Sequence, residues 1–130
     1  MRFTNWQYPK FDEMGMTKWG WMCQHHENLI LGEQTDIGCG SYLNAKFGIE
    51  IQENCQIASH VSIYSINTID NTQGKVTIKK NSCVGANSVI LPGVTIGENS
   101  IIGALSLVNK DIPNNCIAFG IPVRVRRIKK

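Results

Sequence analysis

The sequence predicts an all-β, single-domain protein that folds as a short β-helix of about four coils. Two observations predict this fold. An aliphatic residue recurs at every sixth position over most of the chain, and the composition favours strands and tight turns. The 130 residues are enough for one compact domain and too few for two ordinary ones.

The composition favours strands over helices. The chain has 17 Ile and 8 Val against 6 Leu and 5 Ala. Branching at Cβ suits a pleated strand, whereas Ala and Leu dominate helices. Gly and Asn occur 12 times each. Both tolerate the positive φ angles that tight corners need, so the chain is expected to turn often.

The six-residue period is the strongest signal. Its aliphatic members fall into three runs, interrupted twice, and a strand face of two residues cannot bury itself alone. Successive units must therefore stack, three to a coil, around a continuous aliphatic interior. The twelve members are Leu31, Ile37, Leu43, Ile51, Ile57, Ile63, Ile78, Val84, Ile90, Ile96, Ile102 and Val108.

Two neighbouring registers support the same frame. The residue two places before each aliphatic is small or apolar, as expected of a second inward position on one strand face. The residue three places after it is often one that accepts left-handed backbone, which marks a corner. The corner residues are Gly40, Asn54, His60, Asn81, Asn87, Gly93 and Asn99.

The period divides the chain into three segments. Residues 1–28 contain all three tryptophans and are expected to cap the open end of the stack. Residues 29–111 form the repeat, with an excess of two residues at 44–48 and an extruded loop at 65–75. Residues 112–130 provide a final strand, at 116–119, and a basic tail. A loop extruded from a rigid solenoid is a common carrier of function.

Charge and cysteine usage exclude several classes of function. Five cations lie in the last seven residues, so the remaining 123 residues carry a net charge of −2 and no nucleic-acid surface is expected. The five cysteines form no CxxC pair, which argues against a disulfide framework or a structural zinc site. No apolar run is long enough to span a membrane. A soluble cytoplasmic protein is therefore expected.

Residues 81–130 resemble the hexapeptide-repeat acyltransferases, specifically the galactoside and maltose O-acetyltransferase group. The segment VNKDIPN at 108–114 and the Gly-x-Pro-x-Arg pattern at 120–124 are the most specific parts of this resemblance. The match is weaker between residues 31 and 65 and does not cover residues 1–28 in detail.

The resemblance implies a left-handed parallel β-helix that assembles as a homotrimer, with active sites between subunits. It implies acetyl-CoA as the co-substrate and no metal. The acceptor class is a sugar or a nucleotide-linked amino sugar of surface polysaccharide biosynthesis. Small residues would let the pantetheine arm approach the coil backbone, and cations suit its phosphates. The corresponding cofactor-binding positions are Ala86, Ala104, Asn109, Lys110, Arg124 and Arg127.

The sequence departs from this group at the catalytic base. The O-acetyltransferases use a histidine in the extruded loop to take the hydroxyl proton. The matching position here falls near Thr68, and the loop has no histidine. The acidic contacts to a galactoside fall near Gly38 and Ala45, which cannot replace them. A free amine attacks a thioester without a strong base, so N-acetylation of an amino sugar stands beside O-acetylation.

Two residues are candidates for the catalytic role. His60 opens the strand that leads to the loop, although its corner register also suits a purely structural histidine. Asp70, in the loop, could accept a proton from an ammonium acceptor or bind it. The candidate substrate-binding residues, all in the two inserted segments, are Asn44, Asn67 and Thr68.

Two other classes of function remain as alternatives. A γ-carbonic-anhydrase-like metalloenzyme shares the β-helix trimer, but it needs three well-spaced histidines, and adjacent His25 and His26 with His60 fit poorly. The two adjacent histidines are expected to belong to the cap unless a neighbouring subunit brings them to the cleft. A non-catalytic structural or ice-binding solenoid needs a regular outward threonine array, which the sequence lacks.

Overall fold

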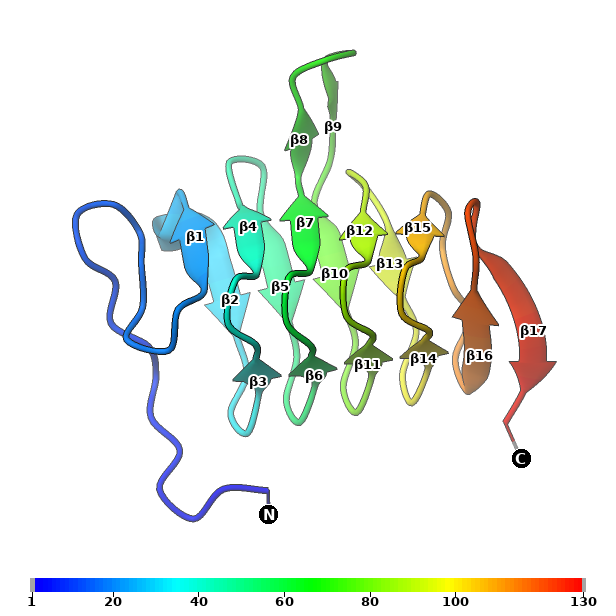
Figure 1. Cartoon of the computed structure of the whole chain (residues 1–130), viewed down its shortest axis with the longest axis horizontal. Coiled ribbons are helices and arrows are strands. Elements are labelled where there is room, and N and C mark those ends of the chain that lie inside the picture. The colour runs from blue at the N-terminus through cyan, green and yellow to red at the C-terminus, as the bar shows by residue number, and fades with distance from the viewer. Residues whose placement is uncertain (1, 130) are drawn as a thin grey trace.

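The computed structural model describes residues 2–129 and is a left-handed parallel β-helix of about five turns. Figure 1 shows the turns stacked side by side along the long axis, with one hairpin projecting from the middle of the stack. Each of the first four turns contributes one strand to each of three sheets, because the six-residue units join short strands through tight corners. The predicted fold class is confirmed.

The three sheets run parallel to the axis of the stack, and the chain visits them in the order A, B, C in every turn. Sheet A contains β1 (Met22–Gln24), β4 (Tyr42–Asn44), β7 (Ser62–Tyr64), β12 (Val89–Ile90) and β15 (Leu107–Val108). Sheet B contains β2 (Leu29–Leu31), β5 (Ile49–Ile51), β10 (Val76–Ile78) and β13 (Thr95–Ile96). Sheet C contains β3 (Asp36–Ile37), β6 (Gln56–Ile57), β11 (Cys83–Val84), β14 (Ile101–Ile102), β16 (Cys116–Phe119) and β17 (Arg124–Ile128).

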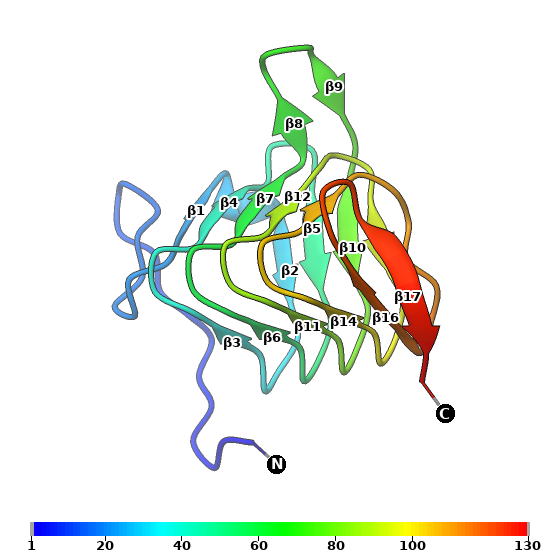
Figure 2. The same cartoon turned by 45° about the vertical axis from the view of Figure 1, so that its right-hand side comes forward.

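Three corners connect the sheets, and we name them by the sheets they join: A–B, B–C and C–A. A short 3-10 helix, η1 (His26–Asn28), occupies the A–B corner of the first turn. The extruded loop leaves the A–B corner of the third turn as an antiparallel hairpin of β8 (Ile66–Asn67) and β9 (Thr72–Gln73). Figure 2 shows the hairpin standing clear of the stack.

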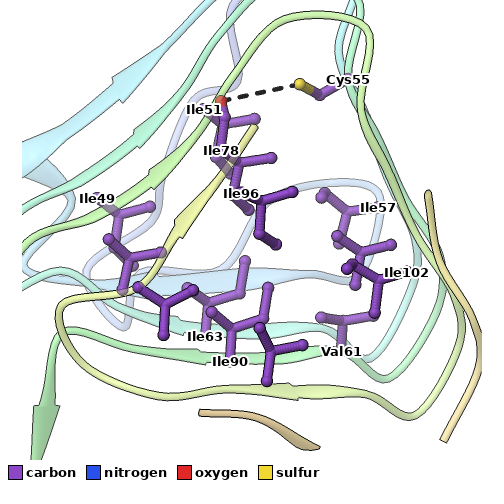
Figure 3. Close-up of a cluster of buried hydrophobic side chains, with 14 of the residues drawn as sticks. Ile49, Ile51, Cys55, Ile57, Val61, Ile63, Ile78, Ile90, Ile96 and Ile102 are labelled. Carbon is purple, nitrogen blue, oxygen red and sulfur yellow. Dashed lines mark hydrogen bonds between the residues drawn. The ribbon is translucent and has the colours of Figure 1, made fainter. Parts of the chain in front are cut away.

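All twelve predicted aliphatic positions are buried, because parallel pairing in register places like positions of successive turns one above another. Leu43 pairs with Ile63, and Ile63 is followed in the same column by Ile90. Figure 3 shows the buried side chains enclosed by the coils, with Ile63 beside Ile90 and Ile78 beside Ile96. The aliphatic interior is therefore continuous from the first turn to the last.

Serines occupy many of the inward positions two residues before each aliphatic. Their hydroxyl groups donate hydrogen bonds to backbone carbonyls at the corners. Ser82 Oγ donates to the carbonyl of Gly97 at 2.6 Å, and Ser100 Oγ donates to the carbonyl of Pro113 at 2.6 Å. Among the described residues, no buried side-chain nitrogen or oxygen lacks a partner. A small hydroxyl group thus fits inside the stack without a desolvation penalty.

The predicted corners adopt left-handed backbone. All seven predicted positions have positive φ, from 57° at His60 to 82° at Gly93. Leu105 shares this conformation, with φ of 60°. A bulky residue is rare there because its Cβ crowds the following carbonyl.

Both ends of the stack extend beyond the predicted repeat. Cys23, in β1, begins an additional turn, and Ile112 and Ala118 complete the last one. Segment 116–119 forms the predicted strand, and the tail adds β17 antiparallel to it, while Lys130 lies outside the described residues. At the other end, Trp21 is buried against Phe11 with ring centroids 5.6 Å apart. β1, which lies within the predicted cap, already pairs with β4 of the repeat. The division of the chain into cap, repeat and tail stays a prediction.

Candidate active site

The C–A corner aligns His60 with the two alanines predicted to contact the cofactor. The residue after Ala86 donates its backbone N–H to the carbonyl of Ser59 at 3.2 Å, and the residue after Ala104 donates to the carbonyl of Ala86 at 2.9 Å. Ser59, Ala86 and Ala104 therefore form one column, and His60 adjoins its lower end. Strands of neighbouring turns lie about 4.8 Å apart. Along the axis and toward the N-terminal end of the stack, His60 therefore lies about 5 Å from Ala86 and about 10 Å from Ala104.

His60 is held as a corner residue and keeps its ring exposed. Its backbone is left-handed, with φ of 57°. The ring lies over Gly40, the corner residue of the turn below, where a Cβ would approach Nε2 to 2.6 Å. Within residues 2–129 the imidazole makes no hydrogen bond or ion pair. The structure therefore places an unpaired imidazole beside the predicted cofactor column.

A shallow groove of about 250 Å³ runs along the outer face of sheet C beside this corner. Small residues of three successive turns form one side of it: Gly38, Ala58 and Gly85. Gly85 cannot carry a side chain, because a Cβ would lie 2.4 Å from the backbone nitrogen of Ala104. The groove can accept an extended chain that runs parallel to the axis. Its floor includes the half-buried side chains of Cys83 and Ile101.

Cations gather at the C-terminal end of the groove. Arg124 in β17 pairs with Phe119, which lies directly above Gly103, next to Ala104. Arg127 pairs with Ile117 in the same hairpin. Over the described part of the chain, the side chains of the two arginines make no hydrogen bond or ion pair, so both charges can meet a phosphate. Arg126 differs, since its Nε donates to the carbonyl of Phe119 at 3.2 Å.

The structure places Asn109 and Lys110 apart from this column. Both follow β15 at the A–B corner of the last turn, and both are exposed. Ala104 precedes the same strand at the C–A corner, so the width of sheet A separates the two predicted groups. Within one chain, the six predicted cofactor positions thus form two sets, separated by sheet A.

The extruded hairpin lies at the A–B corner and carries three of the predicted residues. Asp70 Oδ1 accepts hydrogen bonds from Thr72 N–H at 3.1 Å and Thr72 Oγ at 2.8 Å. Both bonds lower the pKa of Asp70, and the bond from the Thr72 side chain has the larger effect. Asn67 Oδ1 accepts from Ile69 N–H at 3.1 Å, and Thr68 is exposed at the tip. The turn thus fixes the shape of a hairpin tip that projects into solvent.

The base of the hairpin is anchored to the turn below it. Buried Ser65 donates through Oγ to the carbonyl of Asn44 at 2.7 Å and accepts from Phe47 N–H at 2.9 Å. Lys75 Nζ lies 2.9 Å from Glu50 Oε1. The Lys75 hydrogen bond, followed by that of Gln52, lowers the pKa of the Glu50 carboxyl. The insertion at 44–48 and the hairpin are therefore one supported unit.

Two tyrosines on the outer face of sheet A were not among the sequence candidates. Tyr42 Oη donates to Gln24 Oε1 at 3.0 Å and accepts from Asn44 Nδ2 at 3.3 Å. The rings of Tyr42 and Tyr64 lie 5.8 Å apart below the hairpin. Side chains alternate along a strand, so the neighbours of the inward-facing Leu43 and Ile63 must face outward. This alternation could have identified both tyrosines. The predicted residue Asn44 is thus part of an aromatic and amide surface.

The other two histidines lie in the first turn, at the A–B corner. His26 stacks on Phe11 with ring centroids 4.4 Å apart, and His25 Nδ1 lies 3.9 Å from Glu27. Neither shares a corner with His60. Across residues 2–129, no group of three His, Cys, Asp or Glu residues is placed to hold a metal ion. The same residues contain no helix with the length and hydrophobicity that a membrane crossing requires.

Comparison with known proteins supports the resemblance seen in the sequence. Residues 75–110 match the family model described as bacterial transferase hexapeptide (six repeats). The chain is 37% identical over 111 residues to the galactoside O-acetyltransferase of Lactococcus lactis subsp. lactis, a match that covers 74% of this chain and 54% of that protein. The chain thus spans about half the length of this relative.

Two solved structures share the fold. The maltose O-acetyltransferase of Clostridium difficile 630 superposes with a TM-score of 0.76 at 32% identity, over 85% of this chain and 64% of that one. A variant of the N-acyltransferase AntD of Bacillus cereus, in complex with dTDP-4-amino-4,6-dideoxyglucose and coenzyme A, gives a TM-score of 0.72 at 25% identity. That match covers 88% of this chain and 80% of that one. By sequence repeat and by fold, the chain groups with the hexapeptide-repeat acyltransferases, with galactoside and maltose O-acetyltransferases among its relatives.

Proposed function

We propose that the chain is an acetyl-CoA-dependent acetyltransferase that acts on a sugar or a nucleotide-linked amino sugar in surface polysaccharide biosynthesis. One observation carries the proposal. Arg124, at the start of β17, lies next to the C–A corner, and Ala104, Ala86 and His60 follow one another down that corner, beside a groove. Phosphates, an extended arm and a thioester need this order of cation, small residues and base.

The acetyl-transfer step uses His60 as the proton acceptor. The amine or hydroxyl of the acceptor attacks the thioester carbonyl, a new C–N or C–O bond forms, and the C–S bond breaks. The imidazole of His60 takes the proton of the nucleophile and returns it to the leaving thiolate. An amine acceptor places less demand on this base than a sugar hydroxyl. The AntD complex, which holds an amino-sugar nucleotide and coenzyme A, supports N-acyl transfer to an amino sugar on a similar fold.

Assembly as a homotrimer would complete this site. Asp70, Asn67 and Thr68 project at the A–B corner, whereas His60 lies at the C–A corner across the width of sheet A. A neighbouring subunit that lays its hairpin against the C–A corner would bring Asp70 to the acceptor, where the carboxylate binds an ammonium group. Ile69, at the hairpin tip, is 92% exposed in the single chain, and a neighbouring subunit would cover it. Free thiols throughout the chain and a supply of acetyl-CoA favour a cytoplasmic location.

The experiment combines acetyl-CoA with a panel of amino sugars, nucleotide-linked amino sugars and galactosides. Product is detected by mass spectrometry, because the exposed Cys39 of the chain itself would react with a thiol reagent. Acetylated product is expected with at least one amino-sugar acceptor. Absence of product with every acceptor, together with no acetyl-CoA binding, would overturn the proposal.

Variants separate the proposed roles. His60→Asn keeps a residue that tolerates the left-handed corner, and its kcat is expected to fall by about 100-fold or more with an unchanged KM for acetyl-CoA. Arg124→Ala is expected to raise that KM, and Lys10→Ala, in the exposed N-terminal segment, serves as the charge-matched control. An unchanged kcat in the His60 variant would leave it a corner residue only.

A further inference from the structure

A second cavity, of about 470 Å³, lies at the N-terminal end of the stack, outside the site described above. It lies between the first turn and the N-terminal segment, and its volume is within the range of about 300–1,000 Å³ typical of small-molecule sites. All three tryptophans of the chain line it, Trp6, Trp19 and Trp21. Trp21 is buried and Trp6 donates through Nε1 to the carbonyl of Thr35 at 2.8 Å. Trp19 is 44% exposed, and Lys18 Nζ lies over its ring, 4.8 Å from the ring centroid, so a ligand would stack on the part of the ring that Lys18 leaves uncovered.

The polar lining of this cavity narrows the ligand chemistry. Asp36 and Lys18 contribute one charge of each sign, and Asn5 and Thr4 add neutral polar groups. The balanced charge does not suit a phosphate or a strongly charged ligand. In the part of the chain that the structure describes, the Asp36 carboxylate has no hydrogen-bond or ion-pair partner. A carboxylate beside exposed aromatic rings suits a ligand with hydroxyl or amino groups on its edges and an apolar face.

The cavity is also continuous with the shallow groove on the outer face of sheet C. Asp36 lines both, and the groove extends from it along sheet C past the turn that carries His60. Arg124 lies in the last turn and Asp36 in the first, so His60 falls between the two ends of this surface. An acceptor that presents its reactive group at His60 can extend toward Asp36, away from the cofactor.

We infer that the tryptophan-lined cavity is a saccharide-binding site, which holds a neutral or amino sugar unit of the acceptor beyond the unit that is acetylated. The inference rests on the proposed function for the identity of the acceptor. A pyranose stacks its apolar face on Trp19 and offers its hydroxyl or ammonium groups to Asp36. The site makes a longer acceptor a better substrate than a single sugar.

Intrinsic fluorescence tests this directly, because every tryptophan of the chain lines the cavity. The full chain is titrated, without acetyl-CoA, with glucosamine, galactose, lactose and chitobiose, and with uracil as a planar non-saccharide probe. A saturable change with a disaccharide is expected, with a weaker response to a monosaccharide. Trp19→Ala should weaken binding by about three- to tenfold, and Trp19→Phe, which keeps a stacking ring, should retain it within about twofold. Asp36→Asn should weaken glucosamine more than galactose.

The outcomes separate this inference from the proposed function. No saturable response to any sugar, or equal binding by Trp19→Ala and the unmodified chain, overturns the inference even if acetyl transfer is observed. Binding of uracil in preference to every sugar also overturns it. Saccharide binding without acetyl transfer keeps the cavity as a saccharide site and removes the proposed activity. In an active chain, Trp19→Ala should raise KM for a disaccharide acceptor and leave kcat unchanged.

Discussion

Replacement of Leu105 by asparagine should stabilise the protein, although it removes a hydrophobic side chain. Leu105 has φ of 60° at the C–A corner and is 64% exposed. The other left-handed corner residues of this ladder are glycine, histidine and asparagine. An asparagine side chain tolerates the conformation because it can hydrogen-bond locally, whereas the Cβ and branched chain of leucine crowd the backbone.

The expected magnitude follows from two opposing effects. Left-handed backbone costs an ordinary residue about 1–2 kcal/mol, most of which the asparagine avoids. Only about a third of the Leu105 surface is removed from water. Since full burial of a leucine is worth about 1.5–3 kcal/mol, its loss here costs about 0.5–1 kcal/mol. The net gain for Leu105→Asn is therefore about 0.5–1 kcal/mol.

Urea unfolding at one fixed protein concentration measures this gain, and the thermal midpoint should rise by about 2–5 °C. Asn87→Leu is the matched control, because Asn87 lies one turn below at the same corner with φ of 60°. It should lower stability by a similar amount. If Leu105→Asn instead destabilises the protein by 1 kcal/mol or more, the strain argument is refuted and Leu105 must be held by contacts that outweigh it.

Three further predictions concern the core, the thiols and the hairpin base. Ile63→Ala should lower the free energy of unfolding by about 2–5 kcal/mol and Ile63→Val by about 0.5–1.5 kcal/mol, because Ile63 is fully buried; equal losses in urea unfolding would contradict this column packing. Burial raises the pKa of Cys55 to about 11, so Cys39 should react with a disulfide reagent well before Cys55, and mass spectrometry of the labelled peptides tests the order. The lowered pKa of Glu50 means that its bond to Lys75 stabilises the fold above the ordinary Glu pKa of about 4.3 and is lost as the pH falls through the folded value. Unmodified protein should therefore lose about 0.2–1 kcal/mol more than Glu50→Gln between pH 7 and pH 3, and a pH dependence that is the same in both proteins would contradict it.

The six-residue period was sufficient to predict the core, because each of its steps corresponds to one strand and one corner. The period missed the outer turns for a physical reason. Cys23 is not aliphatic, and Ile112 follows Val108 after only four residues, so neither fits the counted frame. Pairing with β4 and a bridge to Ile96 nevertheless extend the stack at both ends.

The six-residue period was also sufficient to predict that His60, Ala86 and Ala104 share a corner. Ile57, Val84 and Ile102 are each the middle unit of a coil, so the corners that follow them must align. The groove and the tryptophan-lined cavity were not predictable in this way. Both depend on how far glycine and alanine let neighbouring turns approach, and on how the non-repeating N-terminal segment lies across the first turn.

The path of the cofactor tests the account most directly, and a crystal structure of the full chain with coenzyme A measures it. The account predicts that the phosphates lie beside Arg124, that the pantetheine arm follows Ala104 and Ala86, and that the sulfur ends beside His60. Coenzyme A bound along the A–B corner, with its sulfur remote from His60, would contradict the proposed catalytic arrangement.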